Sequence, residues 1–126
     1  MADKLLIIDD DTYIRDLYQE ILTGEGFDVT VAKDGEEGLS YLQQGGFRVV
    51  LMDIMMPKLD GIGILETLKT HPPKTPNGPI LLLTNLDHDP LLSKAEALGA
   101  AKHLVKADML PPMIVSEVKQ ALAKQG

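Results

Sequence analysis

Five short apolar runs recur along the chain, each four to six residues long. They occupy residues 4–9, 28–32, 48–53, 79–84 and 101–106. The first, third and fourth runs are apolar nearly throughout instead of alternating with polar residues. Such runs are typical of strands that are buried on both faces of a parallel sheet. The pattern therefore predicts five strands of a parallel sheet.

The segments between these runs show the periodicity of amphipathic helices. The first segment places apolar side chains on one helix face, at Ile14, Leu17, Tyr18, Ile21 and Leu22. Capping residues precede this stripe and glycines follow it, which predicts a helix that begins near Asp11 or Thr12 and ends near Gly24 or Gly26. Because Asp11 directly precedes the stripe, we predict that it caps this helix rather than binding a ligand.

Four further helices are predicted from weaker stripes. We expect them over residues 34–44, around Ile62, Leu65 and Leu68, around Leu91, Leu92, Ala95 and Leu98, and over residues 111–124. Strand and helix alternate five times, which predicts an α/β protein, a three-layer (βα)5 sandwich around a five-stranded parallel sheet. A chain of 126 residues is expected to form one domain, 1–126, whose core spans about 4–124.

Composition and charge exclude several classes of protein. The chain has 44% hydrophobic and 25% charged residues, an ordinary globular composition, and lacks the run of 18 apolar residues that would cross a membrane. The absence of cysteine excludes disulfides and thiolate zinc sites, and His71, His88 and His103 show no metal-ligand spacing. A net charge of -7 argues against binding to nucleic-acid phosphates. We expect a cytoplasmic protein.

Polar and charged residues end four of the predicted strands. Asp9 and Asp10 end the first, Asp53 the third, Thr84 the fourth and Lys106 the fifth. In an open parallel sheet, ligands bind beyond the carboxyl ends of the strands. A nucleotide or flavin phosphate would need a glycine-rich turn after the first strand, whereas the sequence there is DDDT. Carboxylates about 4 Å apart repel by about 4 kcal/mol per pair at an effective dielectric constant near 20. This edge therefore favours a cation.

The candidate ligands at this edge are carboxylate oxygens, without histidine or cysteine. Such ligands are typical of magnesium or calcium, and magnesium is often completed by phosphate oxygens of a substrate. A carboxylate can also attack phosphorus and form an aspartyl phosphate, while a lysine and a metal neutralise the transferred oxygens. Together with Thr84 and Lys106, the acids predict a magnesium-assisted phosphoryl site.

Four segments together resemble one known family. They are LLIIDDD at the first strand, VVLMDIMMPKLDG around Asp53, LLLTN at Thr84 and GAAKHLVK ending at Lys106. Their order and spacing make the chain, from about residue 4 to residue 124, similar to the response-regulator receiver domain of bacterial two-component signalling. The resemblance implies the flavodoxin-like fold with strand order 2-1-3-4-5. It also implies a phosphorylation-dependent signalling switch rather than an enzyme.

The resemblance implies a role for each site residue. Asp53 is the expected phosphoacceptor. Asp10 is the expected direct ligand of Mg2+, together with Asp53 and the backbone carbonyl of Met55, while Asp9 acts through water or hydrogen bonds. Lys106 is expected to pair with the acceptor carboxylate and then with the phosphoryl group.

The resemblance also implies a switch and its partners. Thr84 is expected to hydrogen-bond a phosphoryl oxygen beside the backbone amide of Asn85, and to couple to an aromatic residue early in the last strand. This chain has His103 there, which can titrate near neutral pH. The proline that commonly follows the family's lysine is Ala107 here, so we expect no cis peptide and a different path for residues 107–110. The implied partners are a sensor histidine kinase or a histidine phosphotransfer protein and a downstream effector, without direct contact to nucleic acid or membrane.

Two other functions stay open at this stage. Asp9-x-Asp11 resembles the nucleophile and acid/base pair of magnesium-dependent phosphohydrolases of the haloacid-dehalogenase type, with Thr84 and Lys106 in later roles. Against this interpretation, Tyr13 replaces the expected threonine, and no acidic metal pair follows Lys106 at a suitable distance. The third interpretation is a receiver-fold scaffold that is not phosphorylated, although all five signature positions are present. The sequence does not distinguish a stand-alone regulator from a part of a longer one.

Overall fold

The computed structural model describes residues 2–86 and 89–125, so His88 lies outside the described residues. The strands are β1 (Lys4–Ile8), β2 (Asp28–Ala32), β3 (Val49–Asp53), β4 (Ile80–Thr84) and β5 (Lys102–Val105). The helices are α1 (Thr12–Gly24), α2 (Gly35–Gln44), α3 (Gly61–Thr70), α4 (Pro90–Ala97) and α5 (Pro111–Ala123), with a short 3-10 helix, η1 (Lys106–Asp108), before α5. Strand and helix alternate as the sequence predicts.

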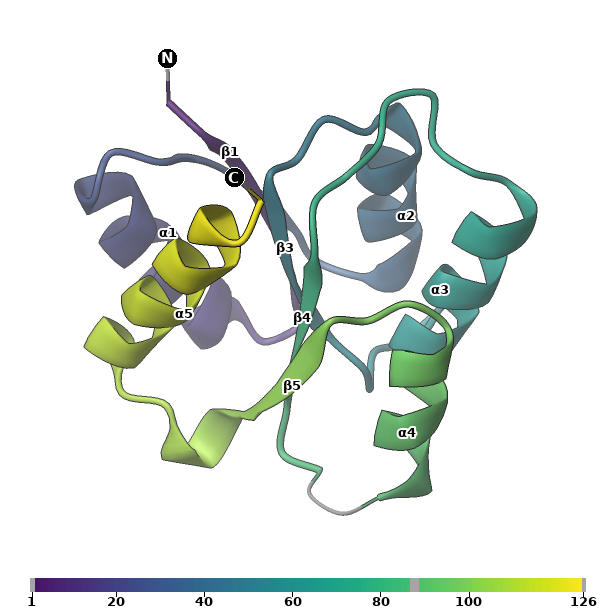
Figure 1. The fold of residues 1–126 in the computed structure, drawn as a ribbon. Helices are drawn as coiled ribbons and strands as arrows, with labels where there is room; N and C mark the ends of the chain where they lie inside the picture. The colour runs from purple at the N-terminus through teal and green to yellow at the C-terminus, as the bar shows by residue number, and fades with distance from the viewer. Residues whose placement is uncertain (1, 87–88, 126) are drawn as a thin grey trace.

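The five strands form one parallel sheet in the order β2-β1-β3-β4-β5. In the register, Ile7 of β1 lies between Val31 of β2 and Leu51 of β3. Figure 1 shows α1 and α5 on one face of the sheet and α2, α3 and α4 on the other. This is the predicted three-layer flavodoxin-like sandwich with strand order 2-1-3-4-5.

The sheet separates two hydrophobic clusters, one under each helical layer. Along β1, Leu6 and Ile8 belong to the cluster under α2, α3 and α4, while Leu5 and Ile7 belong to the cluster under α1 and α5. Successive side chains of a strand point to opposite faces. An interior strand therefore needs apolar residues at every position, which explains why the first, third and fourth runs do not alternate. All residues of β3 and β4 are buried.

The element bounds differ slightly from the predicted ones, mainly at β5. The predicted strand reaches Lys106, but β5 ends at Val105, and Lys106 begins η1. Asp34 lies outside α2 and caps it, and α5 ends at Ala123 instead of Lys124. None of the peptide bonds described is cis, as expected from Ala107. Within residues 2–86 and 89–125, no helix is long and apolar enough to cross a membrane.

Candidate functional site at the carboxyl edge of the sheet

Three carboxylates meet where β1 and β3 end. One oxygen from each of Asp9, Asp10 and Asp53 lies within 4.8 Å of the others. Asp9 has 0% of its surface exposed and Asp53 has 7%, whereas Asp10 is exposed. The neighbouring positions of β1 and β3 in the sheet bring these acids together, as the strand ends predict. The cluster therefore has a buried floor and one acid that is open to solvent.

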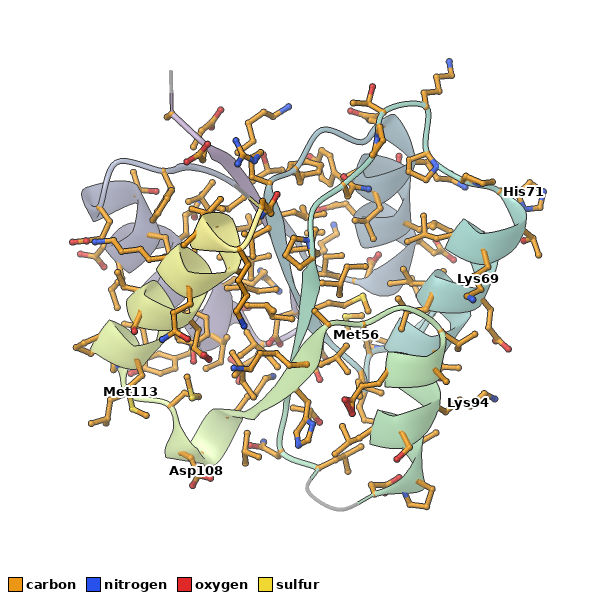
Figure 2. The ribbon with its side chains drawn as sticks, in the orientation of Figure 1. Met56, Lys69, His71, Lys94, Asp108 and Met113 are labelled. Atoms are coloured by element: carbon orange, nitrogen blue, oxygen red, sulfur yellow. The ribbon has the colours of Figure 1, made fainter. Side chains whose placement is uncertain are left out.

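Lys106 supplies a cation to the buried part of the cluster. Its Nζ lies 3.0 Å from Oδ2 of Asp53 and 2.7 Å from Oδ2 of Asp9, and 12% of its side chain is exposed. The lysine comes from η1, which turns the chain out of β5. Figure 2 shows the side chains of Asp108, in η1, and Met113, near the start of α5, pointing away from the sheet. Lys106 is thus directed inward from a short helix whose next residues are exposed.

The β1–α1 turn is held by its own hydrogen bonds. Oδ1 of Asp9 accepts a 2.9 Å bond from the amide of Asp11, and the carbonyl of Asp9 accepts a 2.8 Å bond from Nη1 of Arg15. The sequence-based prediction missed Arg15. A basic residue in the first turn of a helix is unfavourable next to the helix dipole. Its place four residues after three consecutive aspartates was the available signal for a local partner.

Asp11 caps α1 and does not join the acid cluster. Its carboxylate accepts hydrogen bonds from the amides of Tyr13 and Ile14, at 2.9 and 3.3 Å. The residue is exposed, and its side chain is occupied by these bonds. The prediction that Asp11 is a helix cap is therefore confirmed.

Burial and charge shift the pKa values of two groups in the cluster, Asp53 and Lys106. Burial raises the pKa of the Asp53 carboxyl above its ordinary value, although the Lys106 ammonium works against this shift. Burial also disfavours the charged form of Lys106, but Asp9 and Asp53 outweigh it and raise the pKa of the ammonium. The lysine is therefore charged at neutral pH, while burial disfavours the ionised form of Asp53.

The loop after β3 begins with Met55 beside the acceptor carboxylate. The amide of Met55 donates a 3.2 Å hydrogen bond to Oδ1 of Asp53. The side chain of Met55 is 57% exposed. The loop is closed by a 2.8 Å bond from the amide of Gly61 to the carbonyl of Ile54. The amide of Met55 thus contacts the acceptor carboxylate, and the metal-binding role of its backbone carbonyl stays a prediction.

The predicted switch residues lie on one face of the sheet. Oγ1 of Thr84 is buried and accepts a 3.0 Å bond from the amide of Leu86, while Asn85 is exposed. By strand alternation Thr84 and His103 both point toward the α4 side. Nδ1 of His103 lies 4.0 Å from Oε1 of Glu96, on α4. The histidine therefore connects β5 to α4.

The acid cluster has the chemistry of a site for a hard divalent cation. The Lys106 ammonium pairs with two of the three carboxylates, those of Asp9 and Asp53, and the candidate ligands are all oxygen atoms. Oδ2 of Asp9 is buried and lies 2.7 Å from Nζ of Lys106. A cation at the exposed side, near Asp10, would relieve the remaining repulsion. The residues therefore fit Mg2+.

Fold and site together define a flavodoxin-like α/β domain with an acid–lysine cluster at the carboxyl edge of its sheet. The model of the response regulator receiver domain family matches residues 5–119, and the chain belongs to this family. Receiver domains in this family are signalling switches of two-component systems.

Individual relatives agree with this assignment. The chain is 35% identical to the probable chemotaxis protein CheY of Rhizobium etli over 120 residues. The aligned region covers 94% of this chain and 88% of that protein. It is 38% identical to the uncharacterized transcriptional regulatory protein YcbL of Bacillus subtilis over 94 residues. That aligned region covers 75% of this chain but 39% of the relative. The crystal structure of a CheY-like receiver domain protein from Methanospirillum hungatei matches with a TM-score of 0.87 at 27% identity, over 99% of this chain and 97% of that one.

Proposed function

We propose that the domain accepts a phosphoryl group on Asp53 from a phosphohistidine and changes a partner-binding surface in response. The observation that carries this proposal is the position of Lys106, whose ammonium touches both Asp53 and Asp9 inside the acid cluster. Membership in the receiver family supports it further. The donor is a sensor histidine kinase or a histidine phosphotransfer protein, and the signal passes to a downstream effector.

In the transfer, a carboxylate oxygen of Asp53 attacks phosphorus and forms the acyl phosphate bond. The phosphorus–nitrogen bond of the phosphohistidine breaks, and its electron pair and a proton go to the leaving imidazole. Lys106 already lies 3.0 Å from the acceptor carboxylate, so its ammonium is placed to follow the charge onto the phosphoryl oxygens. Because Asp53 is nearly buried, this charge is poorly screened by water, and the contribution of the lysine is large.

Asp10, Asp53 and the backbone carbonyl of Met55 are the groups that would hold Mg2+, with Asp9 supporting them through water or hydrogen bonds. When bound, Mg2+ neutralises charge on the transferred oxygens and helps to align the reacting groups. Asp9 also keeps Lys106 in place through their 2.7 Å contact.

The bound phosphoryl group adds about -1.5 to -2 of charge. Thr84 would hydrogen-bond one of its oxygens, together with the amide of Asn85. Oγ1 of Thr84 accepts a hydrogen bond from the amide of Leu86, which leaves the hydroxyl hydrogen to donate to the phosphoryl group. His103 lies on the same face and reaches Glu96 of α4, so a change at Thr84 can alter the surface formed by α4 and β5.

The haloacid-dehalogenase interpretation loses support from the role of Asp11, which caps α1 and would have to leave that cap to act as an acid or base. The proposed function is tested by intact-mass spectrometry after incubation with acetyl phosphate, with and without Mg2+, on the wild type and Asp53→Asn. We expect one phosphoryl adduct that requires both Mg2+ and Asp53. An adduct that persists in Asp53→Asn would contradict the assignment of the acceptor. A wild type that remains unmodified by both acetyl phosphate and phosphohistidine donors would favour the non-phosphorylated scaffold.

A further inference from the structure

The loop between β3 and α3 contains one strained residue. Lys58 has a φ of 70° and is the only residue other than glycine with a positive φ among residues 2–86 and 89–125. The amide of Leu59 donates a 2.8 Å hydrogen bond to the carbonyl of Pro57, so Lys58 is the centre of a three-residue turn. A γ-turn with positive φ is rare and strained for a residue that carries a Cβ. Such a conformation persists only where the surrounding structure holds it.

An ion pair joins Lys58 to the start of α2. Its Nζ lies 3.4 Å from Oδ2 of Asp34. Asp34 is buried, and its other oxygen, Oδ1, accepts a 2.9 Å hydrogen bond from the amide of Glu37 and caps α2. The bond from Glu37, with a smaller contribution from Lys58, lowers the pKa of Asp34 despite burial. The carboxylate that faces Lys58 is therefore ionised.

The same two segments touch through their backbones. A methyl group on Gly35, the first residue of α2, would collide with the carbonyl oxygen of Leu59. The loop thus follows the start of α2 closely at its tip, where Lys58 and Leu59 lie. At its base the loop is closed by the hydrogen bond between Gly61 and Ile54, directly after Asp53. The residues between these two attachments include Met55.

We propose that the Asp34–Lys58 ion pair positions the acid site by holding Lys58 in its left-handed turn. The ion pair offsets the strain of that turn and so fixes the course of residues 54–60, on which the place of the Met55 carbonyl depends. Asp34 and Lys58 are positioning residues, because they act on the site through the loop. The part that concerns Mg2+ rests on the proposed function, whereas the part that concerns the loop does not.

Asp34→Asn tests the ion pair with little other change. Asparagine caps helices about as well as aspartate, so the bond from Glu37 is kept while the charge that faces Lys58 is removed. Asp60→Asn is the matched control, because Asp60 caps α3 at the other end of the same loop with a 2.8 Å bond from Gly63 and is exposed. In metal-free protein, we expect protection of the Leu59 and Gly61 amides from hydrogen exchange to fall about two- to fivefold in Asp34→Asn. Titration calorimetry with MgCl2 should show a weakening of the same order, and Asp60→Asn should change neither quantity.

Lys58→Gly tests whether strain is what the ion pair offsets. Glycine adopts a φ of 70° without steric cost. Adding Asp34→Asn to Lys58→Gly should therefore have no further effect on exchange or on Mg2+ affinity. Unchanged hydrogen exchange in Asp34→Asn would overturn the proposal. So would an equal increase in exchange when Asp34→Asn is added to Lys58→Gly. Faster exchange in Asp34→Asn with unchanged Mg2+ affinity would also overturn it. If the wild type binds no Mg2+, the proposed function fails, and the exchange measurements alone decide whether the ion pair holds the turn.

Discussion

The ammonium nitrogen of Lys106 lies 3.0 Å from Oδ2 of Asp53, although the two residues are 53 positions apart in the chain. The strand order makes this contact possible, because β3 and β5 flank β4 and all three end at the same edge. Lys106 leaves the sheet in η1 and reaches back over that edge. Its ammonium then pairs with Asp53 and Asp9, two of the three carboxylates in the cluster. This imbalance of charge determines how the site should respond to substitution, pH and metal.

Removal of the ammonium should destabilise the fold. We expect Lys106→Met to lower the free energy of unfolding by about 3 kcal/mol at pH 7, because it leaves buried negative charge without a partner. The neighbouring acids raise the pKa of Lys106 above its ordinary 10.5. Its stabilising contribution is therefore complete below pH 10.5 and is lost as the pH rises through the raised pKa.

Urea unfolding at pH 7 measures the effect of Lys106→Met, with Lys102→Met as the control. Lys102 forms a 2.9 Å ion pair with Glu117 at the protein surface, and exposed pairs contribute about 1 kcal/mol or less. Equal losses of stability in the two variants would contradict the assignment of Lys106 to a buried, charge-compensating role.

Removal of a carboxylate should have the opposite effect in metal-free protein. The pKa of Asp53 is raised by burial, so ionisation of this carboxyl costs stability in the folded state. The folded protein binds the proton more tightly, and stability falls as the pH rises from the ordinary value of 3.8 through the raised pKa. Asp53→Asn should therefore raise the melting temperature at pH 7 and change it little near pH 4. Melting curves from pH 4 to pH 8 without metal test this, and a gain that does not grow with pH would count against it.

Much of the fold could be predicted because burial on both sheet faces leaves a direct record in the sequence. Uninterrupted apolar runs predict the interior strands, and the residues that end them place Asp9, Asp10 and Asp53 at one edge. The contacts that the sequence-based prediction missed join polar side chains whose positions follow neither the strand nor the helix period. The bond from Arg15 to the carbonyl of Asp9 and the ion pair of Lys58 with Asp34 are of this kind. The chemical roles of the acids stay predictions until the phosphorylation experiments are done.

Magnesium should stabilise the protein through Asp10. A ligand that binds only the folded state at 100 times its dissociation constant adds about 2.7 kcal/mol of stability, so the melting temperature should rise with MgCl2. Asp10→Asn removes one exposed carboxylate from the cluster and should shrink this shift. Asp11→Asn keeps the cap of α1 and should leave the shift intact. The same magnesium response in wild type and Asp10→Asn would remove Asp10 from the set of ligands.

The phosphoryl group on Asp53 should be long-lived, because the positions two residues past Asp53 and Thr84 are the apolar Met55 and Leu86. Met55 is exposed beside the acceptor, and Leu86 packs against the hydrophobic cluster under α4. Neither side chain can orient a water molecule for attack on phosphorus. We expect a lifetime of minutes or longer. Intact-mass spectrometry at intervals after the removal of acetyl phosphate measures it.

Met55→Gln tests this explanation. The side-chain amide of glutamine can hold a water molecule near the acceptor, so the substitution should shorten the lifetime of the phosphoryl group about tenfold. Met55→Leu keeps the apolar character at the same position and serves as the control, with an unchanged lifetime. Decay of the wild type within seconds would show that another group activates water. Equal decay in all three proteins would show that the side chain at position 55 does not control access to the phosphoryl group, even though its backbone amide donates a hydrogen bond to Oδ1 of Asp53.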